Sequence, residues 1–520
     1  MKFLQLLIFL LACALALGWF SRRVALPYPI ALVIGGGLLG FVPGLPQLEI
    51  DPQFMLVLVL PPILYQAALL TSWRDFRQNI RQIGSLAIGL VIVTTLLVGA
   101  TLKFLIPDIP WAAAFAFGAI VSPPDAVAAT AILSKLSMPR RIVTVLEGES
   151  LVNDASGLVL YKFAVAAVIV GGFSLVEAGA QFVLISALGV AIGVVIAGLF
   201  VMLHRHIGDP FIEVLVSLSI PYICYVAAEG MHSSGVLAVV AAGLVRGRYA
   251  PAIVSAEMRI LARSVWNILV FMLNSLIFIL IGLQVSAALA RIRTFSGWDL
   301  AAYALAISLV AILVRFAWVY VVEFIPTAVA RLTGLKAEPP LPGEAFVVSW
   351  CGMRGIVSLA AALALPVQID DGNIFPHRDL IIFLTFVVIF VTLVVQGLTL
   401  APIIRRLSIG SDRGARDEHD KARLAMCTAA IAAIDKFARE GAPADLVERL
   451  RAEVSERMVA HSAKTHQPED SGTFSVSSTI RRAAVRAERD ELIRIWRAGE
   501  ISDEVLHHIE EELDYEESRL

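Results

Sequence analysis

Three acidic and two basic side chains lie inside long apolar stretches of the 520-residue chain: Asp125, Glu149, Asp154, Arg315 and Arg354. A charge at the centre of a bilayer costs about 2.5–3.5 kcal/mol even on insertion scales, so each of them is a candidate functional residue. Two guanidiniums can neutralise two of the acids, which leaves one carboxylate without a fixed partner. We expect that carboxylate to choose between a proton and a metal ion.

Segment 147–157 reads Glu-Gly-Glu-Ser-Leu-Val-Asn-Asp-Ala-Ser-Gly. Ser150 and Asp154 are four residues apart, as are Glu149 and Asn153, so the members of each pair share a helix face. Carboxylate, amide and hydroxyl oxygens suit a hard cation such as Na+, and no Cys or His lies nearby to favour a transition metal. Removal from water favours protonation of Asp154, so proton and cation would compete there. The alternative is that Asp154 belongs to a static ion pair.

Residues 122–125, Ser-Pro-Pro-Asp, interrupt an apolar stretch. Two consecutive prolines cannot continue the hydrogen-bond ladder of a helix, so we expect a break. A broken helix at membrane depth exposes carbonyl groups, which are tolerated where they line a cavity or bind an ion. We therefore expect Asp125 and Ser122 to join Asp154, Asn153 and Ser150 at one ion site, with Asp154 and Asp125 as the acidic Na+ ligands. A simple proline kink is the alternative.

A second interruption is predicted in the other half of the chain, where Gly352 and Gly355 flank Arg354. Paired breaks suggest an inverted repeat. Where the breaks cross, we expect Arg354 to face Asp125, and we expect Arg315 to pair with Glu149. For Arg315, snorkelling to the membrane surface is the alternative.

The composition indicates a membrane protein: 58% of the residues are hydrophobic, 17% are charged, and the mean hydropathy is +0.79. The apolar stretches are long and lack period-2 alternation, which favours helices over barrel strands. They predict an all-α polytopic protein with about thirteen transmembrane helices, near residues 3–19, 25–43, 52–70, 82–106, 110–135, 140–171, 178–204, 210–229, 232–246, 262–286, 299–325, 344–367 and 378–404.

Arginine and lysine gather in the loops of one predicted side, whereas the other side has little beyond Arg291, Arg293 and Arg378. Positive loops are cytoplasmic, so this bias predicts an outside N-terminus and a cytoplasmic C-terminus. Residues 1–20 resemble a secretory signal, but a second apolar stretch follows at once, so we interpret them as the first spanning helix. The four cysteines are far apart, which favours packing roles.

The chain divides by composition into a transmembrane exchanger domain, residues 1–408, and a charged cytoplasmic tail, residues 409–520. Apolar residues at helical spacing predict helices at 420–440, 444–462 and 479–498 of the tail, followed by an acidic run at 510–517. We expect this tail to be a helical regulatory domain. His507 and His508 are interpreted as part of a solvated helix face rather than a metal site.

Taken together, these motifs resemble the sodium/proton exchanger family of monovalent cation:proton antiporters, as a bacterial member. The resemblance rests on residues 148–155 with Asp125 upstream and residues 352–355 downstream, and it includes 234–238 and 278–282. It implies a thirteen-helix inverted-repeat fold, a homodimer in the bacterial inner membrane, and an elevator-like movement of a core domain. It also implies Asp154 as the carrier of ion and proton, electroneutral exchange associated with Asn153, and a role in pH homeostasis.

Other readings stay open at this point. A K+/H+ antiporter, or a carrier of Li+, would use the same residues, because a few oxygens do not define cavity size. A cation channel gated by the tail would conduct without protons. A membrane-embedded enzyme would need a nucleophile with a base, and no histidine lies in the central segments apart from the loop-like His204, His206 and His232. We expect no enzyme activity, no cofactor and no nucleic acid partner; lipid and a second copy are the expected partners.

Overall fold

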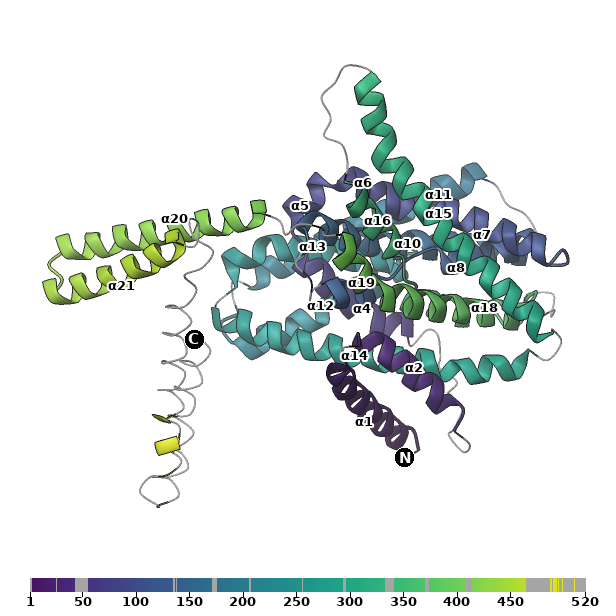
Figure 1. Ribbon diagram of the computed structural model, residues 1–520, viewed down its shortest axis with the longest axis horizontal. Coiled ribbons are helices and arrows are strands. Elements are labelled where there is room, and N and C mark those ends of the chain that lie inside the picture. The colour runs from purple at the N-terminus through teal and green to yellow at the C-terminus, as the bar shows by residue number, and fades with distance from the viewer. Residues whose placement is uncertain are drawn as a thin grey trace. The chain divides into compact units, whose positions relative to one another are not determined.

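The computed structural model is helical throughout the part of the chain that it describes (Figure 1). It describes residues 2–24, 26–42, 55–133, 138–170, 175–204, 207–254, 256–292, 296–332, 341–369, 374–407 and 413–463, with isolated positions elsewhere. Within these ranges, the one β-type pairing is an isolated bridge between Gln368 and Ile374. The chain forms two compact units, Met1–Ser411 and Asp412–Leu520.

The first half of the larger unit ends in one long helix, α10, that follows a series of shorter elements. In chain order these are α1 (Lys2–Arg23), α2 (Tyr28–Gly40), the π-helical turn η1 (Met55–Val59), α4 (Leu60–Leu70), α5 (Trp73–Gln78), α6 (Ile80–Gly84), the π-helical turn η2 (Ser85–Leu90), α7 (Val91–Leu105), α8 (Trp111–Val121), α9 (Ala126–Leu133) and α10 (Arg140–Val170).

The second half contains several long helices and ends in a continuous run through η3. Its elements are α11 (Leu175–His204), α12 (Pro210–Gly230), α13 (Gly235–Ile253), α14 (Ala256–Arg291), α15 (Gly297–Leu332), α16 (Pro342–Trp350), α17 (Ile356–Leu363), α18 (Arg378–Val391), η3 (Thr392–Gln396) and α19 (Gly397–Leu407). Helices α2 and α14 pack side by side, as do α11 and α13.

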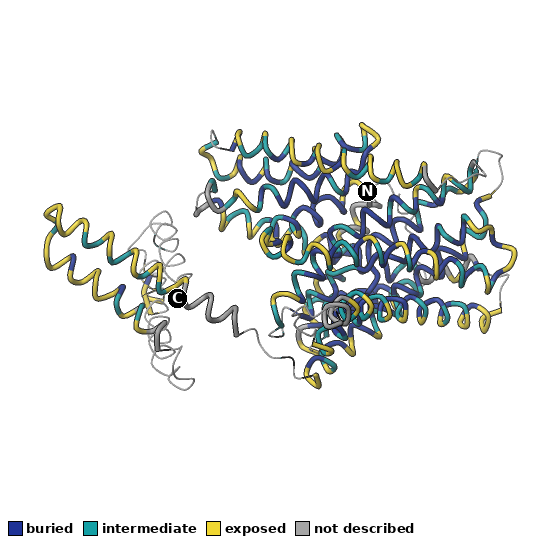
Figure 2. Tube along the Cα trace, turned by 90° about the horizontal axis from the view of Figure 1, so that it is seen from above, coloured by how far each residue is buried: buried dark blue, intermediate teal, exposed yellow. Residues whose placement is uncertain are grey.

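Eight helices of the described chain are long and apolar enough to cross a membrane, and three shorter apolar helices accompany them. The polytopic, all-helical fold is therefore confirmed, whereas the number of thirteen spans stays a prediction. Buried residues gather inside the bundle, and exposed residues lie along its outer helices (Figure 2). On α11, for example, Leu184, Leu199 and Met202 are each more than 60% exposed. Such a surface suits lipid rather than water.

Both predicted helix breaks are confirmed. Helix α8 ends at Val121 and α9 begins at Ala126, and the residues between them are the two prolines with Ser122 and Asp125. Helix α16 ends at Trp350 and α17 begins at Ile356. A long helical segment follows the broken pair in each half. In the first half it is α10, which follows α9, and in the second half it is the continuous run of α18, η3 and α19, which follows α17. The inverted repeat itself stays a prediction.

In the smaller unit, helices α20 (Arg413–Arg439) and α21 (Ala444–Ala463) pack together as a hairpin (Figure 1). The turn between them uses Gly441 at a φ of +94°, a conformation that glycine adopts without strain. Asp435 and Arg451 form an ion pair between the two helices. The helix expected at 479–498, the acidic run and the His507–His508 pair lie largely or wholly outside the described residues.

Candidate functional site

The two breaks meet at Asp125. Its backbone N–H donates to the carbonyl of Met353, with 2.6 Å between nitrogen and oxygen. Its carboxylate accepts from the amide of Val127 at 2.8 Å and from the amide of Ile356 at 3.4 Å. Amides freed at the starts of α9 and α17 thus hold one carboxylate, which satisfies donors that a helix start leaves without an intrahelical partner. Asp125 is fixed in position as a result.

Two glycines allow this close approach. A Cβ atom at Gly355 would overlap the carboxylate of Asp125, and one at Gly352 would overlap the side chain of Arg315. Both positions lie in the break between α16 and α17, where the backbone passes directly beside charged groups. The glycines flanking Arg354 in the sequence therefore make room for two other charged residues.

A cavity of ≈ 140 Å³ lies beside the crossing. Helix α4 lines it with apolar side chains, whereas the oxygen-bearing lining residues come from α9, α10, α17 and the first break: Asp125, Thr130, Glu147, Ser150, Asp154 and Ser358. Asp154 is 6% exposed, and in the described part of the chain its carboxylate makes no hydrogen bond and no ion pair. A buried carboxylate without a counterion is costly, so a proton or a cation would stabilise it.

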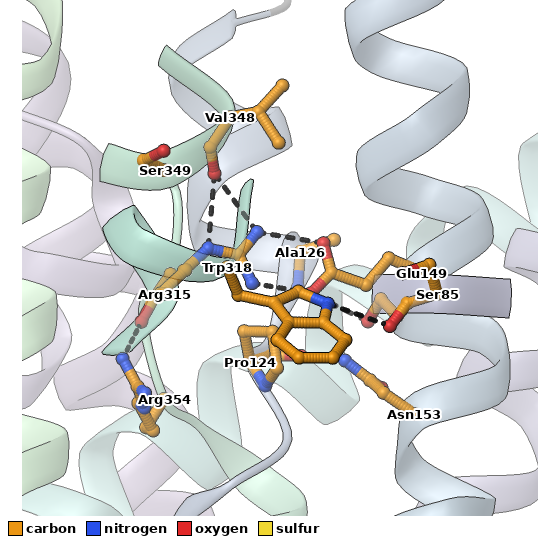
Figure 3. A network of polar contacts seen from close by, with 12 residues as sticks. Ser85, Pro124, Ala126, Glu149, Asn153, Arg315, Trp318, Val348, Ser349 and Arg354 are labelled. Carbon is orange, nitrogen blue, oxygen red and sulfur yellow. Dashed lines mark hydrogen bonds and ion pairs between the residues drawn. The ribbon is translucent and has the colours of Figure 1, made fainter. Parts of the chain in front are cut away.

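Helix α10 supports the first break through two polar side chains. The hydroxyl of Ser150 accepts from the amide of Ala126 at 3.3 Å. The side-chain amide of Asn153 donates to the carbonyl of Pro124 at 2.9 Å, and its own oxygen is buried without a hydrogen-bond donor (Figure 3). Asn153 does not line the cavity. It instead holds the broken backbone next to Asp154.

Glu149 and Arg315 form a buried ion pair. The guanidinium donates to both carboxylate oxygens, at 2.5 and 2.8 Å, and both side chains are at most 2% exposed. Arg315 also donates twice to the carbonyl of Val348, from Nε at 3.1 Å and from Nη2 at 3.0 Å (Figure 3). A bidentate pair supported by further hydrogen bonds is the form in which a buried ion pair persists. Arg315 is therefore buried in this pair rather than snorkelling.

The expected pairing of Arg354 with Asp125 is wrong. Arg354 is buried, and its guanidinium donates to three backbone carbonyls, those of Val121, Gly352 and Ala311 (Figure 3 shows its approach to Arg315). Val121 ends α8 and Gly352 lies in the break after α16, so neither carbonyl is needed by an intrahelical donor. In the described part of the chain, Arg354 takes part in no ion pair.

The charge arithmetic therefore changes. The sequence suggested one carboxylate without a guanidinium, but both Asp125 and Asp154 lack one among the described residues. Ser122 also differs from expectation, because it is not among the residues that line the cavity, and its hydroxyl donates to the carbonyl of Ala119 at 3.0 Å. His204 is not in a loop: it ends α11, is 3% exposed and lies 3.5 Å from Glu213.

Three oxygen-bearing lining residues were missed by reasoning from the sequence: Glu147, Thr130 and Ser358. Glu147 is seven residues before Asp154, a spacing of about two helical turns that keeps both on one face of α10. That spacing could have revealed it. Thr130 lies one turn into α9, and its hydroxyl donates to the carbonyl of Ala126 at 2.9 Å, which leaves its lone pairs available. Nothing in the sequence distinguished it from a packing residue.

The chemistry of the cavity is that of oxygen donors. Among the residues that the structure describes, no cluster of three or more His, Cys, Asp or Glu residues has the geometry of a metal centre. The lining offers three carboxylates, those of Asp125, Glu147 and Asp154, and three hydroxyls, those of Thr130, Ser150 and Ser358. Such oxygens suit reversible binding of a hard monovalent cation or of a proton better than tight capture of a transition metal.

Comparisons with known proteins agree on one family. A family model described as the transmembrane sodium/hydrogen exchanger matches residues 8–406. An uncharacterised Na+/H+ exchanger of Mycobacterium bovis is 34% identical over 510 residues, which cover 96% of this chain and 93% of the relative. A sodium, potassium, lithium and rubidium/H+ antiporter of Bacillus pumilus is 32% identical over 498 residues, which cover 94% of this chain and 73% of the relative.

The fold has a solved counterpart. The structure of the sodium proton antiporter MjNhaP1 from Methanocaldococcus jannaschii at pH 8 matches with a TM-score of 0.61 and 18% sequence identity, and the match covers 78% of this chain and 99% of that chain. At this level of identity the match concerns the fold alone.

Proposed function

Because the chain belongs to the sodium/hydrogen exchanger family, a family of membrane transporters, we propose that it exchanges Na+ for H+ at the carboxylate of Asp154. The exchange is secondary active transport in a multi-pass membrane protein. Asp154 binds either one cation or one proton, and the site opens to the two sides of the membrane in turn.

One observation carries this proposal: the Asp154 carboxylate lines a cavity and has no protein counterion in the described chain, whereas Glu149 is fully paired. A cation or a proton lowers the cost of that buried charge, and two positive guests would repel each other at one carboxylate. Competition between them couples their movements. This competition requires that no arginine or lysine side chain neutralises the Asp154 carboxylate permanently.

The remaining residues have supporting roles in the proposed mechanism. Asp125, held by amides of two helices, contributes a second carboxylate to the cation, and Ser150 lies within the same lining. Asn153 is neutral, so a cycle that carries one cation one way and one proton the other moves no net charge. The crossing breaks allow the bundle that carries the site to move as a unit, in a homodimer whose C-terminus is cytoplasmic.

The cation is proposed as Na+, with Li+ and K+ as further candidates. Relatives of similar identity include both Na+/H+ exchangers and an antiporter named for sodium, potassium, lithium and rubidium. A K+/H+ antiporter is therefore the second candidate. Exchange measured separately with each of the three cations, over several pH values, discriminates between them.

The experiment for the carrier residue uses Asp154→Asn in everted membrane vesicles with a pH-sensitive dye. We expect this variant to insert normally and to lose cation-dependent dissipation of the pH gradient. Asp108→Asn, an exposed acid outside the cavity, is the matched control and should exchange as wild type does. Persistent exchange by Asp154→Asn at wild-type abundance would refute the assignment.

A further inference from the structure

A second hollow, with a volume of ≈ 420 Å³, lies at the surface where α5 meets the end of α13. Its lining residues are Trp73, Arg74, Arg77, Gln78 and Arg248. Three guanidiniums from two elements thus share one hollow, and none of its lining residues is acidic. Nothing in the proposed exchange mechanism uses them.

The packing of α13 on α4 brings these arginines together. Added Cβ atoms at Gly243 and Gly247 would press on the backbone carbonyls of Tyr65 and Leu69, at 2.9 and 2.5 Å, so the two helices touch backbone to backbone. This contact brings Arg248 to the end of α4, where α5 begins. There, Trp73 stacks on Phe76, with ring centroids 6.1 Å apart, and Phe76 is buried. The floor of the hollow is therefore fixed by packing.

The three guanidiniums have no acidic partner among the residues that the structure describes. None of them makes an ion pair or a side-chain hydrogen bond in the described chain, and Asp75, next to Arg74 in the sequence, is not paired with either neighbour. Arg141, by contrast, lies 3.8 Å from both Glu323 and Glu344. Like charges gathered without a counterion repel one another, so an anion in the hollow would stabilise the arrangement.

Two exposed side chains with apolar surface lie close in the sequence to the residues that line the hollow. Leu70, which precedes α5, is 64% exposed, and Tyr249, which follows Arg248, is 48% exposed. A ligand with an anionic headgroup and a hydrocarbon chain would complement this surface, because the headgroup would bind the guanidiniums and the chain would pack on Leu70 and Tyr249. Guanidinium groups bind phosphate oxygens in bidentate geometry, and a tryptophan at the level of the headgroups suits the membrane interface.

We propose that this hollow binds the phosphate group of an anionic phospholipid. The phosphate lies among Arg74, Arg77 and Arg248, and an acyl chain lies along Leu70 and Tyr249. Leu70 also lines the cavity of Asp154, so the end of α4 joins the two sites. An anionic headgroup here cancels positive charge that otherwise repels cations on their way to the cavity. This consequence for transport rests on the proposed function, whereas lipid binding does not.

Binding is tested by native mass spectrometry of the full-length protein titrated with phosphatidylglycerol or phosphatidylcholine. We expect wild type to retain phosphatidylglycerol in preference, and Arg74→Gln/Arg77→Gln/Arg248→Gln to lose at least one bound lipid. The control Arg263→Gln/Arg405→Gln/Arg406→Gln removes equally many exposed charges outside the hollow and should retain wild-type binding. Equal retention by both triple variants would overturn the proposal.

Two further arms identify the source of the anion. Displacement of phosphatidylglycerol by inorganic phosphate at low millimolar concentration would reassign the hollow to a free anion. Stronger lipid binding in a full-length variant whose acids at 510–517 are replaced by amides would show that this segment is the occupant. We expect that neither added inorganic phosphate nor the amide substitutions at 510–517 will change the amount of phosphatidylglycerol that the protein retains.

The effect on transport is measured in liposomes of phosphatidylcholine with and without phosphatidylglycerol. We expect the anionic lipid to lower the apparent KM for the cation of wild type and of the control triple by at least about threefold, and to leave the hollow variant unchanged. An equal response of the hollow variant would overturn the proposed coupling. Absence of exchange in all three proteins would refute the proposed function and leave the mass-spectrometric result standing.

Discussion

The backbone amide of Asp125 donates to the backbone carbonyl of Met353, and this bond of 2.6 Å joins the two broken helices directly. The carboxylate of the same residue accepts from Ile356 on the far side of the second break. A main-chain contact at one end and a side-chain contact at the other fix how the breaks cross. Because Asp125 lines the cavity, any change in the crossing also changes the site.

Gly355→Ala tests this dependence. The added methyl group would overlap the Asp125 carboxylate, so either the carboxylate or the break between α16 and α17 must move. We expect exchange to fall by at least about tenfold, since displacement of a binding group by even 1 Å costs orders of magnitude in activity. Gly198→Ala, where an added Cβ meets open space, is the control. Vesicle assays normalised to inserted protein make the comparison, and unchanged exchange in Gly355→Ala would contradict the tight crossing.

The Glu149–Arg315 pair is expected to contribute stability rather than ion binding. Removal of either partner leaves an uncompensated buried charge, so Glu149→Gln and Arg315→Met should each cost about 3–5 kcal/mol. The double variant should recover part of that loss, because neither charge then remains. Thermal midpoints of the detergent-solubilised protein, followed by size-exclusion chromatography, measure this. A double variant that melts below both single variants would rule out the pairing as the origin of the effect.

The features predicted correctly from the sequence are those with a local cause. Pro123 and Pro124 lack the amide hydrogens that a helix needs, and Gly352 and Gly355 weaken the second helix, so the sequence alone locates both breaks. The pairing of Glu149 with Arg315 followed from a general constraint, because a buried guanidinium needs an acid or several carbonyls.

The orientation of Arg354 could not be predicted, because it has no local cause in the sequence. Its acceptors, the carbonyls of Val121, Gly352 and Ala311, are backbone atoms from three separate segments, and every residue has such a group. A sequence reveals which side chains are charged but not which carbonyls the tertiary fold leaves free. The assignment of an acidic partner to each arginine therefore overcounted ion pairs.

Glu147 offers a test of how cations approach the site. It lines the cavity two turns from Asp154 and has no partner among the described residues, so its charge attracts cations without holding them. Glu147→Gln should raise the apparent KM for the cation by about 3- to 10-fold, the effect of about 1 kcal/mol at one charge, with little change in maximal rate. Cation titrations of exchange in vesicles, with Glu177→Gln as an exposed control, measure the change. An unaltered KM would exclude Glu147 from the path.

Electroneutral exchange is the last prediction, and it follows from the count of titrating groups at the carrier. Asp154 holds one proton or one monovalent cation, and Asn153 is a neutral amide bound to the carbonyl of Pro124, so it adds no charge to the cycle. The exchange rate in liposomes should therefore stay within about 20% when the membrane potential is collapsed, since a cycle without net charge does no work against the field. Current recordings on a solid-supported membrane provide the direct measurement, and we expect no sustained current on a sodium jump. A steady current that disappears in Asp154→Asn would show that a second group titrates during transport, and Asp125 would then be the residue to replace.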